Sequence, residues 1–106
     1  MKWEISNSMY ITQSKTPVEG AQLALDLSRE NMHSENIKQD VLILSGKNDH
    51  FIPIKMHDRQ VKALVNAKSV TGRIFTKEDH AQNHCQIGNI GLLLDVIVKW
   101  LKEKKV

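Results

Sequence analysis

Two polar segments of the sequence carry side chains that could transfer protons. Segment 46–53 contains Asp49, and segment 76–89 contains His84. A carboxylate can accept a hydrogen bond from one ring nitrogen of a histidine, which fixes the tautomer and stabilises the imidazolium formed when the other nitrogen takes a proton. An Asp after a strand can also be only a turn former or a helix cap. Asp49 and His84 are therefore the candidate catalytic residues if the fold brings them together.

The predicted fold would bring Asp49 and His84 together, because each of the two polar segments follows a predicted strand. Four consecutive apolar residues within 40–46 indicate a short strand buried on both faces, as in a parallel sheet covered by helices. The half-polar segment 69–75 indicates a second strand nearer a sheet edge. In open parallel sheets, functional residues gather beyond the carboxyl ends of the strands, which is where both polar segments begin. The predicted fold class is α/β with at least two parallel strands.

The first of three predicted helices precedes the strands. Thr16 can cap it, Pro17 suits the first helical position, and Glu19 completes a capping box, so the helix is expected to run to about Asn31. Residues 1–15 are polar and irregular and read as a lead-in.

The other two helices follow the strands. Pro53 opens the second helix, which is expected to end at 66–68. Apolar residues at helical spacing predict the third helix over 90–103, with Asn89 as its N-cap. We therefore expect 1–35 to form a lead-in with a cap-like helix, and 36–106 to form a single compact unit.

The order of these motifs resembles the C-terminal part of the α/β-hydrolase fold. The Gly-x-x-Asp-x-x-x-Pro motif at 46–53 is similar to the family's acid loop, and Asn-His-Cys-Gln-Ile-Gly-Asn at 83–89 resembles a stretch of one esterase and peptidase-like branch. The resemblance covers about residues 36–104. It implies a partial α/β-hydrolase sheet, with Asp49 as the acid and His84 as the base of a Ser-His-Asp triad. It also implies a small ester or amide acyl substrate for the full-length enzyme.

The nucleophile of such a triad is missing from the sequence. The family carries its serine on a Gly-x-Ser-x-Gly elbow upstream of the acid. None of the serines here has those flanking glycines, and Ser45 lies inside the end of the predicted strand. The family's oxyanion-hole loop is absent as well. Because loss of the nucleophile alone removes most of the rate, the chain is expected to be an inactive hydrolase fragment.

An alternative interpretation is a self-associating interaction module without catalysis. A two-stranded parallel sheet would leave residues 41–44 with an unpaired backbone edge, which natural proteins cover. This interpretation predicts a homodimer or a higher homo-oligomer that pairs or covers the edge.

A metal site is the third interpretation. His80 and His84 are four residues apart, and Asp49, His50 and Asp79 could add ligands. The comparison with His-Glu-x-x-His fails because position 81 is Ala. We therefore expect neither a metal nor another cofactor, and we expect Cys85 to be a small buried apolar residue.

Composition excludes several classes of protein. The 106 residues have a formal net charge of +3 and a single cysteine, so no disulfide can form within the chain. Apolar stretches are shorter than the ~20 residues that cross a bilayer, and the first residues lack a secretory signal. The C-terminal lysines are interrupted by Glu103 and belong to no recognisable nucleic-acid-binding module, which argues against nucleic-acid binding. The expected protein is soluble and cytoplasmic, with no membrane partner.

Overall fold

The computed structural model describes residues 1–27 and 29–106, which divide into two units, Met1–His33 and Ser34–Val106. The sequence had suggested a division after residue 35. Five α-helices and two strands lie in the described residues, whereas the sequence predicted three helices. None of these helices is long and apolar enough to cross a membrane.

The first unit is helical from its start. Helix α1 (Lys2–Thr12) contacts helix α2 (Pro17–Leu25), and α3 (Arg29–Met32) follows. Gly20 is the buried residue of α2, and a β-carbon there would lie 2.9 Å from the Ser14 hydroxyl. The prediction of an irregular lead-in was wrong, because these residues form helix α1. The sequence did not indicate this helix, because α1 buries no residue and shows no apolar stripe.

The Thr16 cap of α2 is confirmed, but the Glu19 carboxylate accepts from the Lys15 N–H at 2.7 Å and not from the Thr16 N–H that a capping box requires. Thr16 is its N-cap, and its hydroxyl accepts a hydrogen bond from the Glu19 N–H at 3.2 Å, with Pro17 in the first turn. The helix ends at Leu25 rather than near residue 31. Of the positions in the predicted extension, Ser28 lies outside the described residues.

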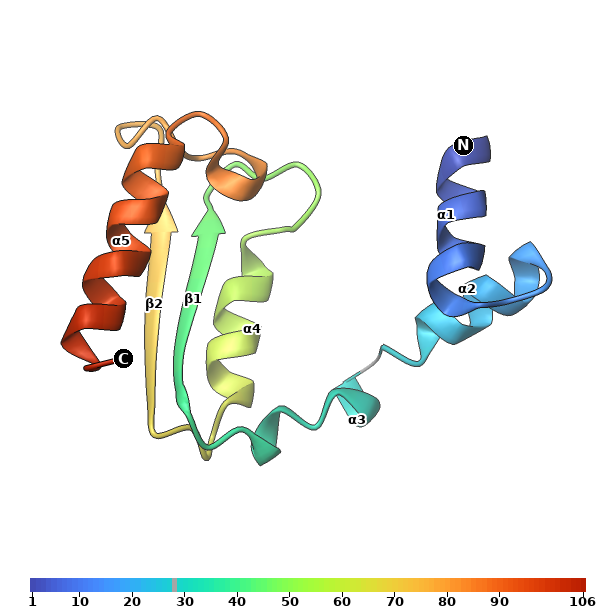
Figure 1. Cartoon of the computed structure of the whole chain (residues 1–106), viewed down its shortest axis with the longest axis horizontal. Coiled ribbons are helices and arrows are strands. Elements are labelled where there is room, and N and C mark those ends of the chain that lie inside the picture. Colours follow the sequence, from blue (N-terminus) through green and yellow to red (C-terminus); the bar gives the residue numbers. More distant parts are fainter. Residues whose placement is uncertain (28) are drawn as a thin grey trace. The chain divides into compact units, whose positions relative to one another are not determined.

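The second unit is built on a two-stranded parallel sheet. Strand β1 (Asp40–Gly46) pairs with β2 (Ser69–Phe75) in continuous register from their first to their last residues (Figure 1). Both strands have the predicted bounds, and the α/β class is confirmed. A short 3-10 helix, η1 (Ser34–Asn36), precedes β1.

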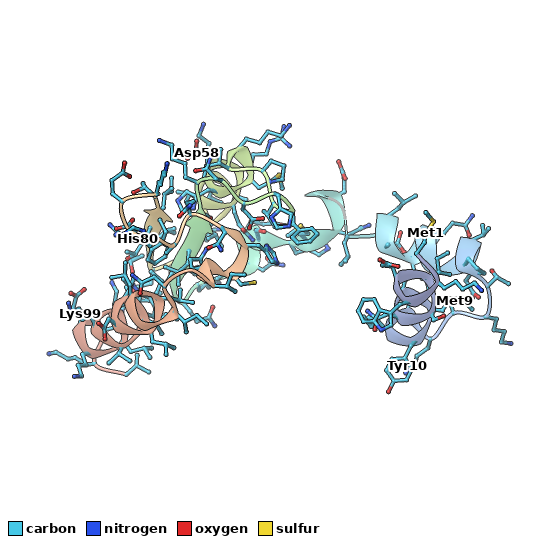
Figure 2. The ribbon with its side chains drawn as sticks, turned by 90° about the horizontal axis from the view of Figure 1, so that it is seen from above. Met1, Met9, Tyr10, Asp58, His80 and Lys99 are labelled. Carbon is cyan, nitrogen blue, oxygen red and sulfur yellow. The ribbon has the colours of Figure 1, made fainter. Side chains whose placement is uncertain are left out.

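Helices α4 (Lys55–Ala63) and α5 (Ile90–Glu103) cover opposite faces of this sheet (Figure 1). On one face, the His57 ring of α4 lies against Gly72, where a β-carbon would be 2.7 Å from its Nε2. On the other face, the Trp100 indole N–H of α5 donates to the Thr71 hydroxyl at 3.1 Å. Adjacent strand residues point to opposite faces, so these contacts place one helix on each side. Figure 2 likewise shows α4 and α5 on either side of the sheet.

The bounds of α5 are as predicted, and those of α4 are shorter. Asn89 caps α5, because its side-chain oxygen accepts from the Leu92 N–H at 3.2 Å. The chain turns at Pro53, whose carbonyl accepts from the Met56 N–H at 2.9 Å, but regular α4 begins two residues later, at Lys55. It ends at Ala63, before the predicted 66–68.

The core of the second unit is small. The buried apolar side chains of the described residues there are Ile43, Leu64, Phe75 and Ala81. In β1, Ile43 and Gly46 are buried and the other five residues are half-buried, so the strand is less buried than predicted. Helices cover both faces of the sheet (Figure 1), but β2 flanks only one edge of β1, and no other described strand covers the opposite edge.

Candidate acid and histidine site

The parallel register places the loops after the two strands side by side. The Lys47 N–H donates to the Phe75 carbonyl and the Asn48 N–H donates to the Gln82 carbonyl, both at 2.9 Å. Gly46 makes this approach possible, because a β-carbon there would lie 2.5 Å from the backbone carbonyl oxygen of Gln82. The acid loop and the histidine loop are thus held together by their backbones.

Asp49 uses both of its carboxylate oxygens. Oδ1 accepts from the backbone N–H groups of Phe51 and Ile52 at 2.8 and 3.0 Å. Oδ2 lies 2.8 Å from Nδ1 of His84. The side chain of Asp49 is only 8% exposed. Asp49 therefore acts as a turn former through one oxygen and as the partner of His84 through the other.

The electrostatics of the pair fix the histidine tautomer. Burial would raise the pKa of Asp49, but hydrogen bonds from the Ile52 N–H, the His84 ring and the Phe51 N–H outweigh it and lower the pKa to about 2. The carboxylate is ionised at neutral pH and can only accept, so we assign the proton of neutral His84 to Nδ1. Nε2 of His84 is then left with a lone pair, as a general base requires.

Aromatic rings next to His84 belong to the acid loop. The Phe51 ring lies 4.8 Å from the His84 ring, centroid to centroid, at an interplanar angle of 67°. The His50 ring in turn lies 4.1 Å from Phe51. Edge-to-face pairs of this kind restrict ring orientation. Sequence reasoning missed both contacts, and their signal is the His50-Phe51 pair directly after the acid.

The loop that presents His84 has an unusual backbone. His84 begins the short 3-10 helix η2 (His84–Gln86), in which Cys85 and Gln86 both have a φ of 53°. Non-glycine residues adopt this left-handed conformation at a cost when the surrounding structure holds them there. Here Asn83 accepts from the Gly88 N–H at 3.3 Å through its side-chain oxygen. Cys85 is exposed, so the prediction that it would be buried was wrong.

A cleft of about 210 Å³ adjoins the pair. Its apolar lining residues come from the end of β1 and from the segment leading into α4, and its polar ones include Asp49 and residues of η2. The lining residues are Leu44, Ser45, Gly46, Asp49, Ile52, Pro53, Ile54, His84, Cys85 and Gln86. None of the described β2 residues lines it, so the cleft lies on the β1 side of the sheet.

A serine–histidine contact, separate from the Asp49–His84 pair, also lies at the cleft. The Ser45 hydroxyl is 2.8 Å from Nδ1 of His57, a residue that sequence reasoning missed. His57 is only 7% exposed, and its Nε2 edge lies against Gly72 instead of a carboxylate. No acid therefore orients this histidine as a base. We interpret the contact as a packing feature that joins β1 to α4.

The residues considered for a metal site do not converge. His80 lies in the loop after β2 with a φ of 54°, not on a helix with His84. Asp79 accepts from Arg73 at 3.0 Å and from the Thr76 N–H at 2.8 Å. Within 1–27 and 29–106, no three His, Cys, Asp or Glu side chains lie close enough to hold a metal ion.

Compared with protein-family models, with curated proteins and with solved structures, the chain matches none.

Proposed function

We propose that the unit Ser34–Val106 is the acid and base part of a serine acyl hydrolase of the α/β-hydrolase type. The observation that carries the proposal is the 2.8 Å contact between the Asp49 carboxylate and Nδ1 of His84, made between loops that follow two paired parallel strands. In the complete enzyme, Nε2 of His84 would take the proton of a serine and return it to the leaving group of an ester or amide. Asp49 would orient the ring and stabilise the imidazolium.

The arrangement supports this role better than a purely structural one. A turn-forming Asp needs only one carboxylate oxygen, and Oδ1 already accepts the two turn N–H groups. Oδ2 is left for a histidine whose side chain is 37% exposed at the cleft. The sequence contains no Gly-x-Ser-x-Gly elbow, so a serine nucleophile would have to come from outside this chain. We also propose that the enzyme is cytoplasmic and that its substrate is a small acyl compound.

Hydrolysis of the activated ester p-nitrophenyl acetate tests the base. Histidine reacts with this ester without a serine, so the chain should release p-nitrophenol faster than buffer, and His84→Gln should remove most of that excess. His80→Gln is the matched control, because His80 is an exposed histidine of the same loop. Asp49→Asn should lower the rate by about tenfold or more, because the ring loses its orienting acceptor. Equal rates for His84→Gln and His80→Gln would refute the assignment.

A serine-directed fluorophosphonate tests the other half of the proposal. The chain alone should not be labelled stoichiometrically, because Ser45 is paired with the buried His57 rather than with His84. Stoichiometric labelling would show that a nucleophile is present and would overturn the proposal of an incomplete site.

A second candidate function is self-association through β1. The observation that favours it is the sheet itself: among the described strands β1 pairs with β2 only, and its apolar residues Val41, Leu42 and Leu44 are half-buried. Exposed edges of this kind template pairing with another chain. Light scattering should then show a dimer at tens of micromolar, and amide exchange within β1 should slow as the concentration rises. A folded monomer with concentration-independent exchange would refute this function.

A further inference from the structure

The polar groups of the cleft differ in whether they are free to bind a ligand. Both carboxylate oxygens of Asp49 are occupied, by two backbone N–H groups and by His84. The Ser45 hydroxyl is occupied by His57. Nε2 of His84 faces no such partner among the described residues, and a ligand entering the cleft can reach it through the exposed part of the ring.

Gln86 offers a second free group. Gln86 is one of the residues that line the cleft, although it is only 5% exposed. Its amide contacts the backbone carbonyl of Asn83 at 3.5 Å, and because a carbonyl can only accept, the amide nitrogen makes this contact. The amide oxygen has no hydrogen-bond partner within the described residues.

That oxygen is open to solvent rather than sealed in the protein. In the described part of the chain, no side-chain nitrogen or oxygen is fully buried without a hydrogen bond. The amide oxygen of Gln86 therefore reaches solvent, and the cleft is the solvent-filled space that this residue lines. A polar atom held in a nearly buried side chain is a strong selector, because a ligand that fails to bond it leaves it unpaired.

The two free groups have the same hydrogen-bonding character. In neutral His84, Nε2 presents a lone pair, since Nδ1 carries the proton, and the amide oxygen of Gln86 also accepts. The apolar residues that line the cleft are Leu44, Ile52, Pro53 and Ile54. At about 210 Å³ the cleft is smaller than the ~300–1,000 Å³ of typical ligand sites, so it fits a short acyl chain.

The geometry points to a ligand with a short apolar chain and a hydrogen-bond donor at its polar end, bound through Gln86. This inference rests on the proposed function and narrows its substrate class to amides, or to acyl compounds with a neighbouring N–H or O–H. A simple ester or ketone carries no donor and would leave the Gln86 oxygen unpaired.

Two probes of equal size test the inference. Butyramide and 2-pentanone differ only by an NH₂ group in place of a methyl group. Titration of each into the ¹⁵N-labelled chain, followed by the NMR signals of Ile52, Cys85 and the Gln86 side chain, gives the two dissociation constants. We expect butyramide to bind about three- to tenfold more tightly, which corresponds to one net hydrogen bond.

Variants assign the preference to a residue. Gln86→Met keeps the length of the side chain but removes the amide, and should reduce the preference for butyramide to below twofold. Gln82→Met is the control, because Gln82 lies in the same loop and does not line the cleft. If Gln86→Met does not fold, the comparison of the two probes on the unaltered chain still decides whether the cleft prefers a ligand with a hydrogen-bond donor.

Three results would overturn the inference: equal or tighter binding of 2-pentanone, an unchanged preference in folded Gln86→Met, or no shift of the cleft signals with either probe. None of them bears on the reaction of His84 with p-nitrophenyl acetate. The inference and the proposed function can therefore fail separately.

Discussion

Gly46 is the position where a single added methyl group should disturb both the fold and the site. A β-carbon at Gly46 would lie 2.5 Å from the carbonyl oxygens of both Gln82 and Asn83. These are backbone atoms, so they cannot rotate away as a side chain would. The loop that carries His84 must therefore move by about 1 Å from β1 to restore ordinary contact.

The cost of Gly46→Ala follows from three contributions. Overpacking costs about 1–3 kcal/mol. The hydrogen bond from the Asn48 N–H to the Gln82 carbonyl, 2.9 Å long, would be strained or lost, at about 0.5–1.5 kcal/mol. Alanine restores about 0.4–1 kcal/mol by restricting the unfolded chain. The net loss should be about 2–3 kcal/mol, a large part of the ~5–15 kcal/mol that stabilises a small domain.

Urea unfolding followed by circular dichroism measures this loss, and the downfield proton resonance of His84 Nδ1–H reports the contact with Asp49. Gly91→Ala is the control, because a β-carbon at that helical position would meet only the Asn89 side chain, at 3.8 Å. It should raise stability by about 0.5 kcal/mol. The reasoning is refuted if Gly46→Ala is as stable as the unaltered chain and keeps the His84 resonance.

Three further predictions concern the same unit. Gly72→Ala should lower the free energy of unfolding by about 1–2 kcal/mol, because its β-carbon would lie 2.7 Å from the His57 ring. Urea unfolding should show no such loss when Gly72→Ala is made in a His57→Ala background, and additive effects of the two substitutions would contradict this explanation. The folded pKa of Asp49, about 2, lies below its ordinary value of 3.8, so its stabilising contribution is complete above pH 3.8 and disappears as the pH falls to 2. As the pH falls from 3.8 to 2, the unfolding free energy should decrease more steeply for the unaltered chain than for Asp49→Asn. Equal pH dependence of the two unfolding free energies would contradict this role of Asp49. Phe75→Ala should lower the free energy of unfolding by about 3–5 kcal/mol, because Phe75 is fully buried. Phe51→Ala should lower it by under 1 kcal/mol, because that residue is 65% exposed, and similar urea midpoints for the two variants would show that burial is not the cause.

Local signals in the sequence were sufficient for much of the fold. The capping residues Thr16 and Asn89 bond the N–H groups that their positions predict, since a cap depends only on residues within one turn. The apolar run of β1 gave its bounds for a similar reason. Helix α1 could not be predicted in this way, because its side chains cover no core and leave no periodic pattern.

The candidate site was predictable only in part. The order of strand, Asp49, strand and His84 was enough to predict the pair, because the topology of a parallel sheet brings consecutive strand ends together. The role proposed for Gln86 depends on which of its two amide ends is occupied, and that is a property of the folded loop alone. The Ser45–His57 contact likewise arises from the packing of α4 on the sheet.

The open edge of β1 bears on both proposed functions. The cleft lies on the β1 side of the sheet, so a strand added to that edge would also supply a further wall of the cleft. A symmetric dimer joined through this edge would pair the two β1 strands antiparallel, because a twofold axis reverses their direction. The amino end of the second β1 would then face the cleft. A parallel strand would instead direct its carboxyl end, where nucleophiles are carried in such sheets, toward His84. The proposed self-association and the proposed catalysis therefore require opposite strand directions at one edge, and a chain paired with its own copy would exclude the strand that the proposed enzyme needs.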